Sequence, residues 1–167
     1  MKDKSSKVNH ELSPIYNNNS KILILGSIPS PKSRNEKFYY AHPQNRFWKI
    51  LSEIFDVEIK NDINLKKEFL LNNNIALWDV IKSCNIVGAS DSTIKNIKIN
   101  NLNMIIDNSN IKAVFTTGKK AYDLYMKYCY PKTQIKAIYL PSTSAANAKF
   151  NLGDLVNKYR IILKYLD

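Results

Sequence analysis

The sequence has few of the residues that build metal centres and disulfide frameworks. It holds only two cysteines, Cys84 and Cys129, and only two histidines, His10 and His42. Two cysteines far apart in the chain exclude a four-cysteine iron–sulfur site, argue against a disulfide framework and suit a reducing compartment. Two histidines argue against a zinc site. We therefore expect no metal in this protein.

Long apolar runs are also missing from the chain. No stretch approaches the ~20 apolar residues that a membrane span requires. Residues 1–7 are polar and lack the apolar centre of a signal peptide. The sequence therefore predicts a cytoplasmic protein that does not associate with membranes.

Acidic residues are scarce relative to basic ones. The 167-residue chain carries 14 acidic and 25 basic side chains, and its formal net charge is +11. A charge of this size suits a polyanionic partner, most simply nucleic acid. The alternative is a lysine-rich protein without such a partner. The basic residues are scattered along the sequence, so they do not delineate a surface that would contact DNA. Length and apolar content suit one domain with a real core.

Short apolar runs alternate with stretches of helical spacing along the chain. Continuous apolar runs predict buried strands at 21–26, 75–78, 112–117 and 134–140. Apolar residues at helical spacing predict helices at 45–55, 64–72, 102–106, 119–130 and 152–166. This alternation predicts an α/β domain over residues 21–167, with a parallel sheet flanked by helices. Residues 1–20 are expected to form an irregular polar lead-in, and we find no repeat or internal linker.

Prolines and turn signals mark the connections between these elements. Pro29 and Pro31 are expected to keep the first loop free of regular helix, and Pro131 to end the helix before it. The stretch 81–96 has a mixed pattern with turn signals, so we assign it no regular element.

Two loops that follow predicted strands concentrate small and polar side chains. Loops after parallel strands gather at one edge of the sheet, where ligands bind. Loop 26–30 is small enough for close approach to a ligand, but it lacks the ending of a phosphate-binding P-loop. Loop 141–147 carries three hydroxyls, which together with backbone N–H groups suit a phosphodiester oxygen. Each loop, taken alone, could equally be an ordinary turn that leads into a helix.

The segment 38–48 holds five aromatic residues within eleven positions. Aromatic rings offer stacking faces to nucleic-acid bases. Phe47 and Trp48 lie on the apolar face of the predicted helix and are expected in the core, whereas Tyr39 and Tyr40 precede the helix and are better placed to face a cleft. Asn45, at the helix start, is either an N-cap or a site residue.

Taken together and in this order, six segments resemble the uracil-DNA glycosylase superfamily. HPQNRFWK is similar to a segment of the mismatch-specific uracil/thymine glycosylases. GSIPS, GASDSTI and LPSTSAAN are most similar to the hypoxanthine-DNA (deoxyinosine) glycosylase branch. The resemblance runs from about Lys21 to the end of the chain, and its segments are 26–30, 40–49, 76–81, 88–94, 118–121 and 140–147.

The resemblance implies a three-layer α/β/α sandwich with a four-stranded parallel sheet. It implies a monofunctional enzyme that flips a deaminated base out of DNA, hypoxanthine before uracil or xanthine, and hydrolyses its N-glycosidic bond to leave an abasic site. Such an enzyme needs no cofactor, and we expect a monomer. Two alternatives stay open. The first is a catalytically silent member of the superfamily that only binds nucleic acid. The second is a relative that acts on a small nucleotide or nucleoside, and the net charge argues against this second alternative because a small ligand needs no wide basic surface.

The resemblance also implies roles for individual residues. Asn45 would be the catalytic residue that holds the water or the base. Tyr40 would stack on the flipped base, and Asp79 would read its edge, unless Asp79 is merely a helix N-cap. The remaining base-pocket residues would be Gly26, Ser27, Ile28 and Pro29, and the DNA contacts would come from Ser30, Ser142, Thr143, Ser144, Ala146 and Asn147.

Three positions depart from the pattern of the relatives. Ile28 stands where uracil-specific members carry the Asp or Asn that orients the water, which predicts weak excision of uracil. Ser142 stands where relatives use His or Asn near the leaving base. Ala146 stands where relatives insert a Leu wedge into the base stack, so we expect Asn147 to share that task and flipping from perfect duplex to be poor.

Overall fold

A four-stranded parallel sheet forms the centre of the computed structural model, which describes residues 4–167. Its strands are β2 (Ile22–Gly26), β3 (Ile75–Asp79), β6 (Ala113–Thr117) and β7 (Ala137–Leu140), in the order β3-β2-β6-β7. Every residue of β2 and β3 is buried, because helices cover both faces of the sheet. This is why β2 and residues 75–78 of β3 are continuously apolar. The predicted fold class is confirmed.

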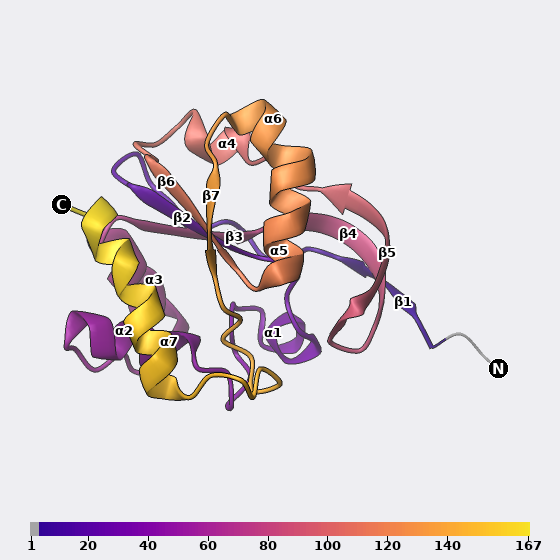
Figure 1. The fold of residues 1–167 in the computed structure, drawn as a ribbon, viewed down its shortest axis with the longest axis horizontal. Coiled ribbons are helices and arrows are strands. Elements are labelled where there is room, and N and C mark those ends of the chain that lie inside the picture. Colours follow the sequence, from indigo (N-terminus) through magenta and orange to yellow (C-terminus); the bar gives the residue numbers. More distant parts are fainter. Residues whose placement is uncertain (1–3) are drawn as a thin grey trace.

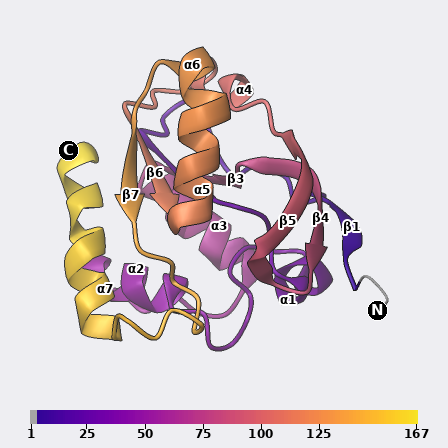
Figure 2. The ribbon, with the colours of Figure 1, turned by 45° about the vertical axis from the view of Figure 1, so that its right-hand side comes forward.

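Helices pack on the two faces of the sheet and complete a three-layer sandwich (Figures 1 and 2). One face carries α5 (Lys119–Leu124), which runs through a π-helical turn (Tyr125–Cys129) into α6 (Tyr130–Thr133). The other face carries α2 (Phe47–Phe55), α3 (Ile63–Asn72) and α7 (Leu152–Tyr159), which a 3₁₀ segment (Arg160–Tyr165) extends; α4 (Asn103–Ile106) is a single turn. None of the helices within residues 4–167 is long and apolar enough to cross a membrane.

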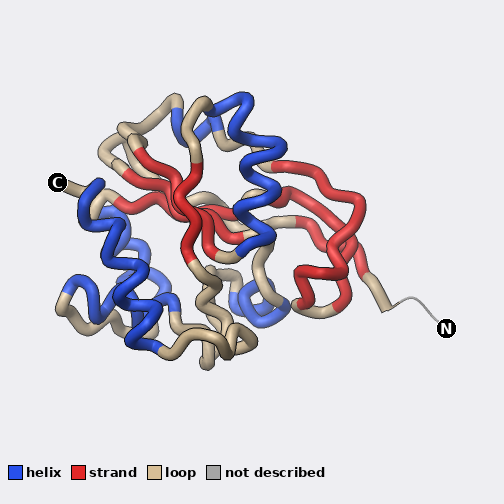
Figure 3. The backbone as a smooth tube through the Cα atoms, in the orientation of Figure 1, coloured by secondary structure: helices blue, strands red, loops and turns tan. Residues whose placement is uncertain are grey.

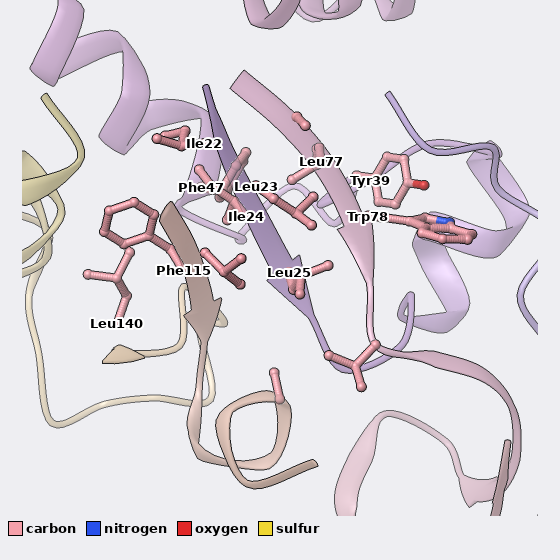
Figure 4. Close-up of a cluster of buried hydrophobic side chains, with 14 of the residues drawn as sticks. Ile22, Leu23, Ile24, Leu25, Tyr39, Phe47, Leu77, Trp78, Phe115 and Leu140 are labelled. Carbon is pink, nitrogen blue, oxygen red and sulfur yellow. The ribbon is translucent and has the colours of Figure 1, made fainter. Parts of the chain in front are cut away.

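The core lies between β2 and the helices beside it. Figure 4 shows Phe47 of α2 beside the side chains of β2, and Phe115 on the neighbouring strand β6. Phe47 and Phe115 are both fully buried, and α2 also buries Trp48, Ile50 and Leu51. Full burial of each such side chain contributes about 1.5–3 kcal/mol to the stability of the fold. The sheet is therefore a stable support for the loops at its end.

A second, antiparallel sheet lies beside the sandwich, and the sequence did not predict it. It consists of β1 (Ser6–Asn9), β4 (Ile81–Val87) and β5 (Ser90–Ile99), in the order β1-β4-β5. The expectation of an irregular lead-in is therefore wrong for β1, and 81–96 belongs to a regular hairpin. The lead-in pairs because β4 would otherwise present unpaired backbone groups at the sheet edge. Ile15 adds a further bridge to Leu77.

Two expectations based on proline are corrected as well. A short helix, α1 (Pro31–Glu36), follows the first loop, with Ser30 accepting a hydrogen bond from Ser33 N at 3.2 Å. Proline is compatible with this position because the first helical residues have no intrahelical N–H partner. The helix after β6 continues past Pro131, because the π-helical turn before it relieves the clash between the proline ring and the preceding turn.

The strands of the parallel sheet all end at the same side of the molecule. The loops after β2 and after β7 lie together there, near α1, at the bottom of Figures 1 and 3. The predicted site segments therefore come together at the carboxyl edge of the sheet.

Candidate active site

A cavity of about 380 Å³ opens at the carboxyl edge of the parallel sheet. This volume falls in the range of small-molecule pockets. Of the residues assigned to the site from sequence, the cavity gathers Gly26, Ser27, Ile28, Pro29, Ser30, Tyr40, Asn45, Asp79, Ser142, Thr143, Ser144 and Ala146. Asn147 does not line it and instead donates a hydrogen bond from Nδ2 to the carbonyl of Ser142 at 3.0 Å.

A larger cavity, of about 800 Å³, lies between the lead-in and helices α1 and α3. Its lining includes the basic side chains of Lys7, Arg34, Lys37 and Lys67. Apart from Tyr39, none of its lining residues borders the smaller cavity. We take the smaller cavity as the candidate active site, because it collects residues from the ends of β2, β3 and β6 and from both loops.

Arg46, at the N-cap of α2, fastens the second loop to that helix. Its guanidinium donates hydrogen bonds to the carbonyls of Phe150 at 2.6 Å, Ser144 at 2.8 Å and Asn147 at 3.0 Å. Its backbone N–H donates to the carbonyl of Thr143 at 3.0 Å. A planar guanidinium can satisfy several carbonyls at once, so this one side chain fixes the second loop relative to α2.

The carbonyl oxygen of Asn45 is already in use within the protein. Its Oδ1 accepts hydrogen bonds from Phe47 N at 2.9 Å and from the hydroxyl of Thr143 at 2.8 Å. The N-cap of α2 is Arg46 rather than Asn45, so the N-cap interpretation of Asn45 is wrong; Asn45 precedes the cap and lines the cavity. The side-chain NH₂ group makes no hydrogen bond with residues 4–167, so the group that Asn45 can offer to a ligand is a donor.

Tyr40 forms part of the cavity wall in a constrained conformation. Its φ is +52°, in the left-handed region, and its hydroxyl lies 3.1 Å from Thr117 Oγ1. One face of its ring stacks on Phe47, with centroids 3.9 Å apart. Burial, with a smaller contribution from the charge of Asp79, raises the pKa of the Tyr40 hydroxyl above its usual range, so it stays neutral.

Tyr39, which the sequence also placed near a cleft, is mainly a core residue. Only 3% of its surface is exposed, and its hydroxyl donates to the carbonyl of Ser13 at 2.7 Å.

Asp79 lies at the floor of the cavity, buried at the end of β3. Its Oδ2 lies 2.7 Å from Nε2 of His10, which the lead-in brings to the site. Its Oδ1 faces Gly26: a Cβ added to that glycine would lie 2.5 Å from it. Asp79 begins no helix, so the helix N-cap alternative is excluded. Sequence reasoning missed His10, because 69 residues separate it from Asp79 and no spacing pattern links them.

Asp91 is a second residue that sequence reasoning did not assign to the site. It lines the cavity from the start of β5 and accepts a hydrogen bond from the hydroxyl of Ser27 at 3.0 Å. Desolvation raises the pKa of Asp91, while the bond from Ser27 and the charge of Lys120 oppose that rise. A signal existed in the sequence, since Asp91 lies within GASDSTI.

The second loop contributes both fixed and open positions. Thr143 is 2% exposed, and its hydroxyl is committed to Asn45. Ser144 N donates to Ser142 Oγ at 3.2 Å, which shapes the turn. Ala146 lines the cavity and is exposed, so it is open to a partner.

The side chains present offer hydrogen-bond donors, acceptors and stacking faces rather than a metal centre. Within residues 4–167, no group of three or more His, Cys, Asp or Glu side chains could hold a metal ion. The cavity can bind a flat polar molecule: Asp79 can accept, Asn45 can donate, and Tyr40 provides an aromatic wall.

Comparison with known proteins identifies two DNA glycosylases to which this chain is similar. The chain is 36% identical to hypoxanthine DNA glycosylase of Methanosarcina barkeri over 81% of this chain and 86% of that protein. It is 31% identical to the hypoxanthine DNA glycosylase of Methanosarcina acetivorans over 82% of this chain and 87% of that protein.

A solved structure shares the same architecture. A solution NMR structure from Methanosarcina acetivorans, provisionally named a uracil DNA glycosylase, superimposes with a TM-score of 0.75 at 28% identity and covers 91% of this chain and 96% of that one. The family pattern of the uracil DNA glycosylase superfamily matches residues 13–166. The chain therefore belongs to the uracil-DNA glycosylase superfamily.

Proposed function

We propose that the protein is a monofunctional DNA glycosylase that removes deaminated bases, hypoxanthine in preference to uracil or xanthine, and leaves an abasic site. The observation that carries this proposal is the carboxylate of Asp79 in the cavity lining, whose Oδ1 faces Gly26 while Oδ2 is held by His10. The names of the two curated relatives support the same substrate.

An ionised carboxylate can only accept hydrogen bonds, and this property distinguishes deaminated bases from their parents. Hypoxanthine carries an N1–H donor where adenine carries a lone pair, and uracil carries an N3–H donor where cytosine carries a lone pair. Asp79 therefore attracts the deaminated base and repels adenine or cytosine. Tyr40 would stack on the flipped base with the ring face that Phe47 leaves uncovered.

Asn45 would act by positioning rather than by taking a proton. Its NH₂ group can donate to a carbonyl oxygen of the base or hold the oxygen of the attacking water. In the reaction the C1′–N bond breaks and its electron pair leaves with the base, while water adds to C1′ and releases a proton. A donor aimed at the leaving base stabilises the charge that develops there.

Ile28 would make uracil a poor substrate. It borders the cavity and packs against the core, and its side chain can neither orient nor deprotonate a water molecule. A pyrimidine that depends on an activated water would therefore react slowly, whereas a purine gains more stacking and more contacts to its leaving ring.

DNA would bind across the cavity mouth. The net charge of +11 suits phosphate contacts that release counterions, and the loop groups of Ser30, Ser142, Ser144 and Asn147 would lie near the strand. Flipping costs unstacking energy, and the small Ala146 fills the vacated space poorly. Mispaired lesions are therefore the expected substrates, bound by a monomer in the cytoplasm.

The experiment that tests this function compares matched oligonucleotides that carry deoxyinosine, deoxyuridine opposite G, deoxyxanthosine or no lesion, each followed by alkaline cleavage. Cutting at deoxyinosine well above deoxyuridine is the expected result. Strong cutting at deoxyuridine would contradict the proposed preference and show that another group activates the water.

One further candidate is a silent member of the family that binds DNA without excision. Two observations favour it: Ile28 lines the cavity with an apolar side chain that cannot orient a water molecule, and the Oδ1 of Asn45 is occupied by Phe47 N and Thr143. This candidate predicts salt-sensitive retention of every oligonucleotide without any base release.

A further inference from the structure

We propose that His10 is a positioning residue of the active site, which holds the Asp79 carboxylate with Oδ1 toward the base. This inference rests on the proposed function, because it assigns to the lead-in a part in reading the base. His10 precedes residues 13–166, the stretch that the family pattern matches.

The contact between the two side chains is short and shielded from water. His10 Nε2 and Asp79 Oδ2 are 2.7 Å apart, and their side chains are 1% and 5% exposed. No other side chain within residues 4–167 donates a hydrogen bond to this carboxylate. A buried carboxylate without a donor is strongly destabilised, so His10 supplies an interaction that the site cannot draw from solvent.

The imidazole is itself held in place. Its backbone N–H donates to the carbonyl of Lys82 at 2.8 Å, which extends the pairing of the lead-in with β4. Its ring lies between Tyr39 and Trp78, with centroid distances of 6.1 and 6.0 Å. These two rings are anchored to the lead-in in turn, because Tyr39 donates to the carbonyl of Ser13 and Trp78 to that of Leu12.

The geometry gives each oxygen of Asp79 a separate task. When Nε2 of His10 carries the proton and donates to Oδ2, the carboxylate stays an acceptor and its plane is fixed. Oδ1 then faces the space above Gly26, where a Cβ would lie 2.5 Å from it. Without His10 no side chain of residues 4–167 fixes the plane of the carboxylate, and its rotation would spoil the match to an N–H of the base.

The decisive experiment measures single-turnover release of hypoxanthine by wild type, His10→Ala, His10→Gln, Asp79→Asn and the double variant His10→Ala/Asp79→Asn. We expect His10→Ala to lower the rate about 10- to 100-fold while DNA affinity stays unchanged. We expect His10→Gln to recover most of the rate, because its amide can donate to Oδ2. In the Asp79→Asn background, His10→Ala should cost no more than about twofold, because His10 acts through the carboxylate.

Val8→Ala provides a matched control in the same strand. Val8 is a buried residue of β1 that does not touch Asp79, so its truncation loosens the lead-in without removing the contact. We expect Val8→Ala to melt at a lower temperature than wild type. At temperatures below its melting point it should excise at the wild-type rate. An equal loss of rate in Val8→Ala and His10→Ala would overturn the positioning role, as would independent, additive losses in the double variant.

A second measurement separates this inference from the proposed function. The chain has only two histidines, so NMR of ¹⁵N-labelled imidazoles resolves His10 from His42. We expect the His10 Nε2–H to be protected from exchange and to shift in Asp79→Asn, with His42 unchanged. An unprotected His10 signal would overturn the contact itself. A protected signal in an enzyme that releases no base would overturn the proposed function alone.

Discussion

The hydroxyl of Thr143 donates a hydrogen bond to Oδ1 of Asn45 across 98 residues of sequence, at 2.8 Å. This bond joins the second loop to the segment that precedes α2, and no hydrogen bond within residues 4–167 occupies the Asn45 NH₂ group, which is therefore the part of the side chain that can donate to a ligand. Thr143→Val keeps the shape but removes the donor, so we expect excision of hypoxanthine to fall about tenfold, since the half-buried Oδ1 of Asn45 loses a hydrogen bond. Thr143→Ser, which keeps the donor, should excise at nearly the wild-type rate in a single-turnover assay.

Replacement of Asn45 tests the catalytic assignment itself. Asn45→Ala removes the donor that the cavity depends on, and we expect excision to become undetectable. Duplex binding, measured by fluorescence anisotropy at several salt concentrations, should keep its affinity and salt dependence, because phosphate contacts lie elsewhere. Excision that survives in Asn45→Ala would show that another residue carries the chemistry.

Gly26 is required because the Asp79 carboxylate occupies the space of its missing side chain. In Gly26→Ala the new Cβ would lie 2.5 Å from Asp79 Oδ1 and 3.2 Å from the Tyr40 hydroxyl. We expect the carboxylate to be displaced and base release to fall by at least about tenfold. Gly153→Ala is the matched control, since its Cβ would come no closer than 3.4 Å to Asn151 Oδ1. It should leave activity intact and slightly stabilise α7.

Arg46 should matter for stability as well as for activity. Arg46→Met removes the donors to the carbonyls of Phe150, Ser144 and Asn147. We expect a loss of about 2–3 kcal/mol in the free energy of unfolding, measured by urea denaturation. Faster proteolysis within 141–150 should accompany it. A variant with wild-type stability and an uncut loop would show that the loop is held by other contacts.

Alkaline pH should destabilise the fold through Cys129 and the buried tyrosines. Burial raises the pKa of Cys129 from 9.0 to about 11 and that of Tyr125 from 10.0 to about 12. Above pH 9 the unfolded chain therefore loses protons that the folded protein keeps, so stability falls as pH rises. Each such group contributes about 1.4 kcal/mol per pH unit within its window. Denaturation between pH 8 and pH 11 should show this decline, and Cys129→Ala should reduce its slope between pH 9 and pH 11.

The parallel sheet and its loops could be predicted because their signals are local. The continuous apolar run of β2 and the helical spacing of α2 each lie within one short segment, and both are confirmed. The partners of β1 could not be predicted, because its four residues have no apolar pattern and find their partners in β4, far along the chain. The short helix α1 was missed because proline was weighed as a helix breaker rather than as a first helical residue.

The sequence indicated most residues that line the candidate cavity, but it did not indicate the contacts between them. Loop residues such as Gly26 and Asn45 could be assigned from motifs, and the structure brings them to one cavity. Which atom of Asn45 is free depends on Thr143, and the orientation of Asp79 depends on His10. Both contacts join distant segments through single side chains, so no spacing in the sequence reports them.

The most direct test of the proposed function identifies the molecule that the enzyme releases. A duplex with a single deoxyinosine is incubated with excess protein, and the small-molecule fraction is analysed by chromatography and mass spectrometry. We predict free hypoxanthine in the amount of abasic strand formed, with the strand intact until alkali is added. Release of deoxyinosine as a nucleoside or nucleotide, a strand break before alkali, or no release at all would contradict the proposal.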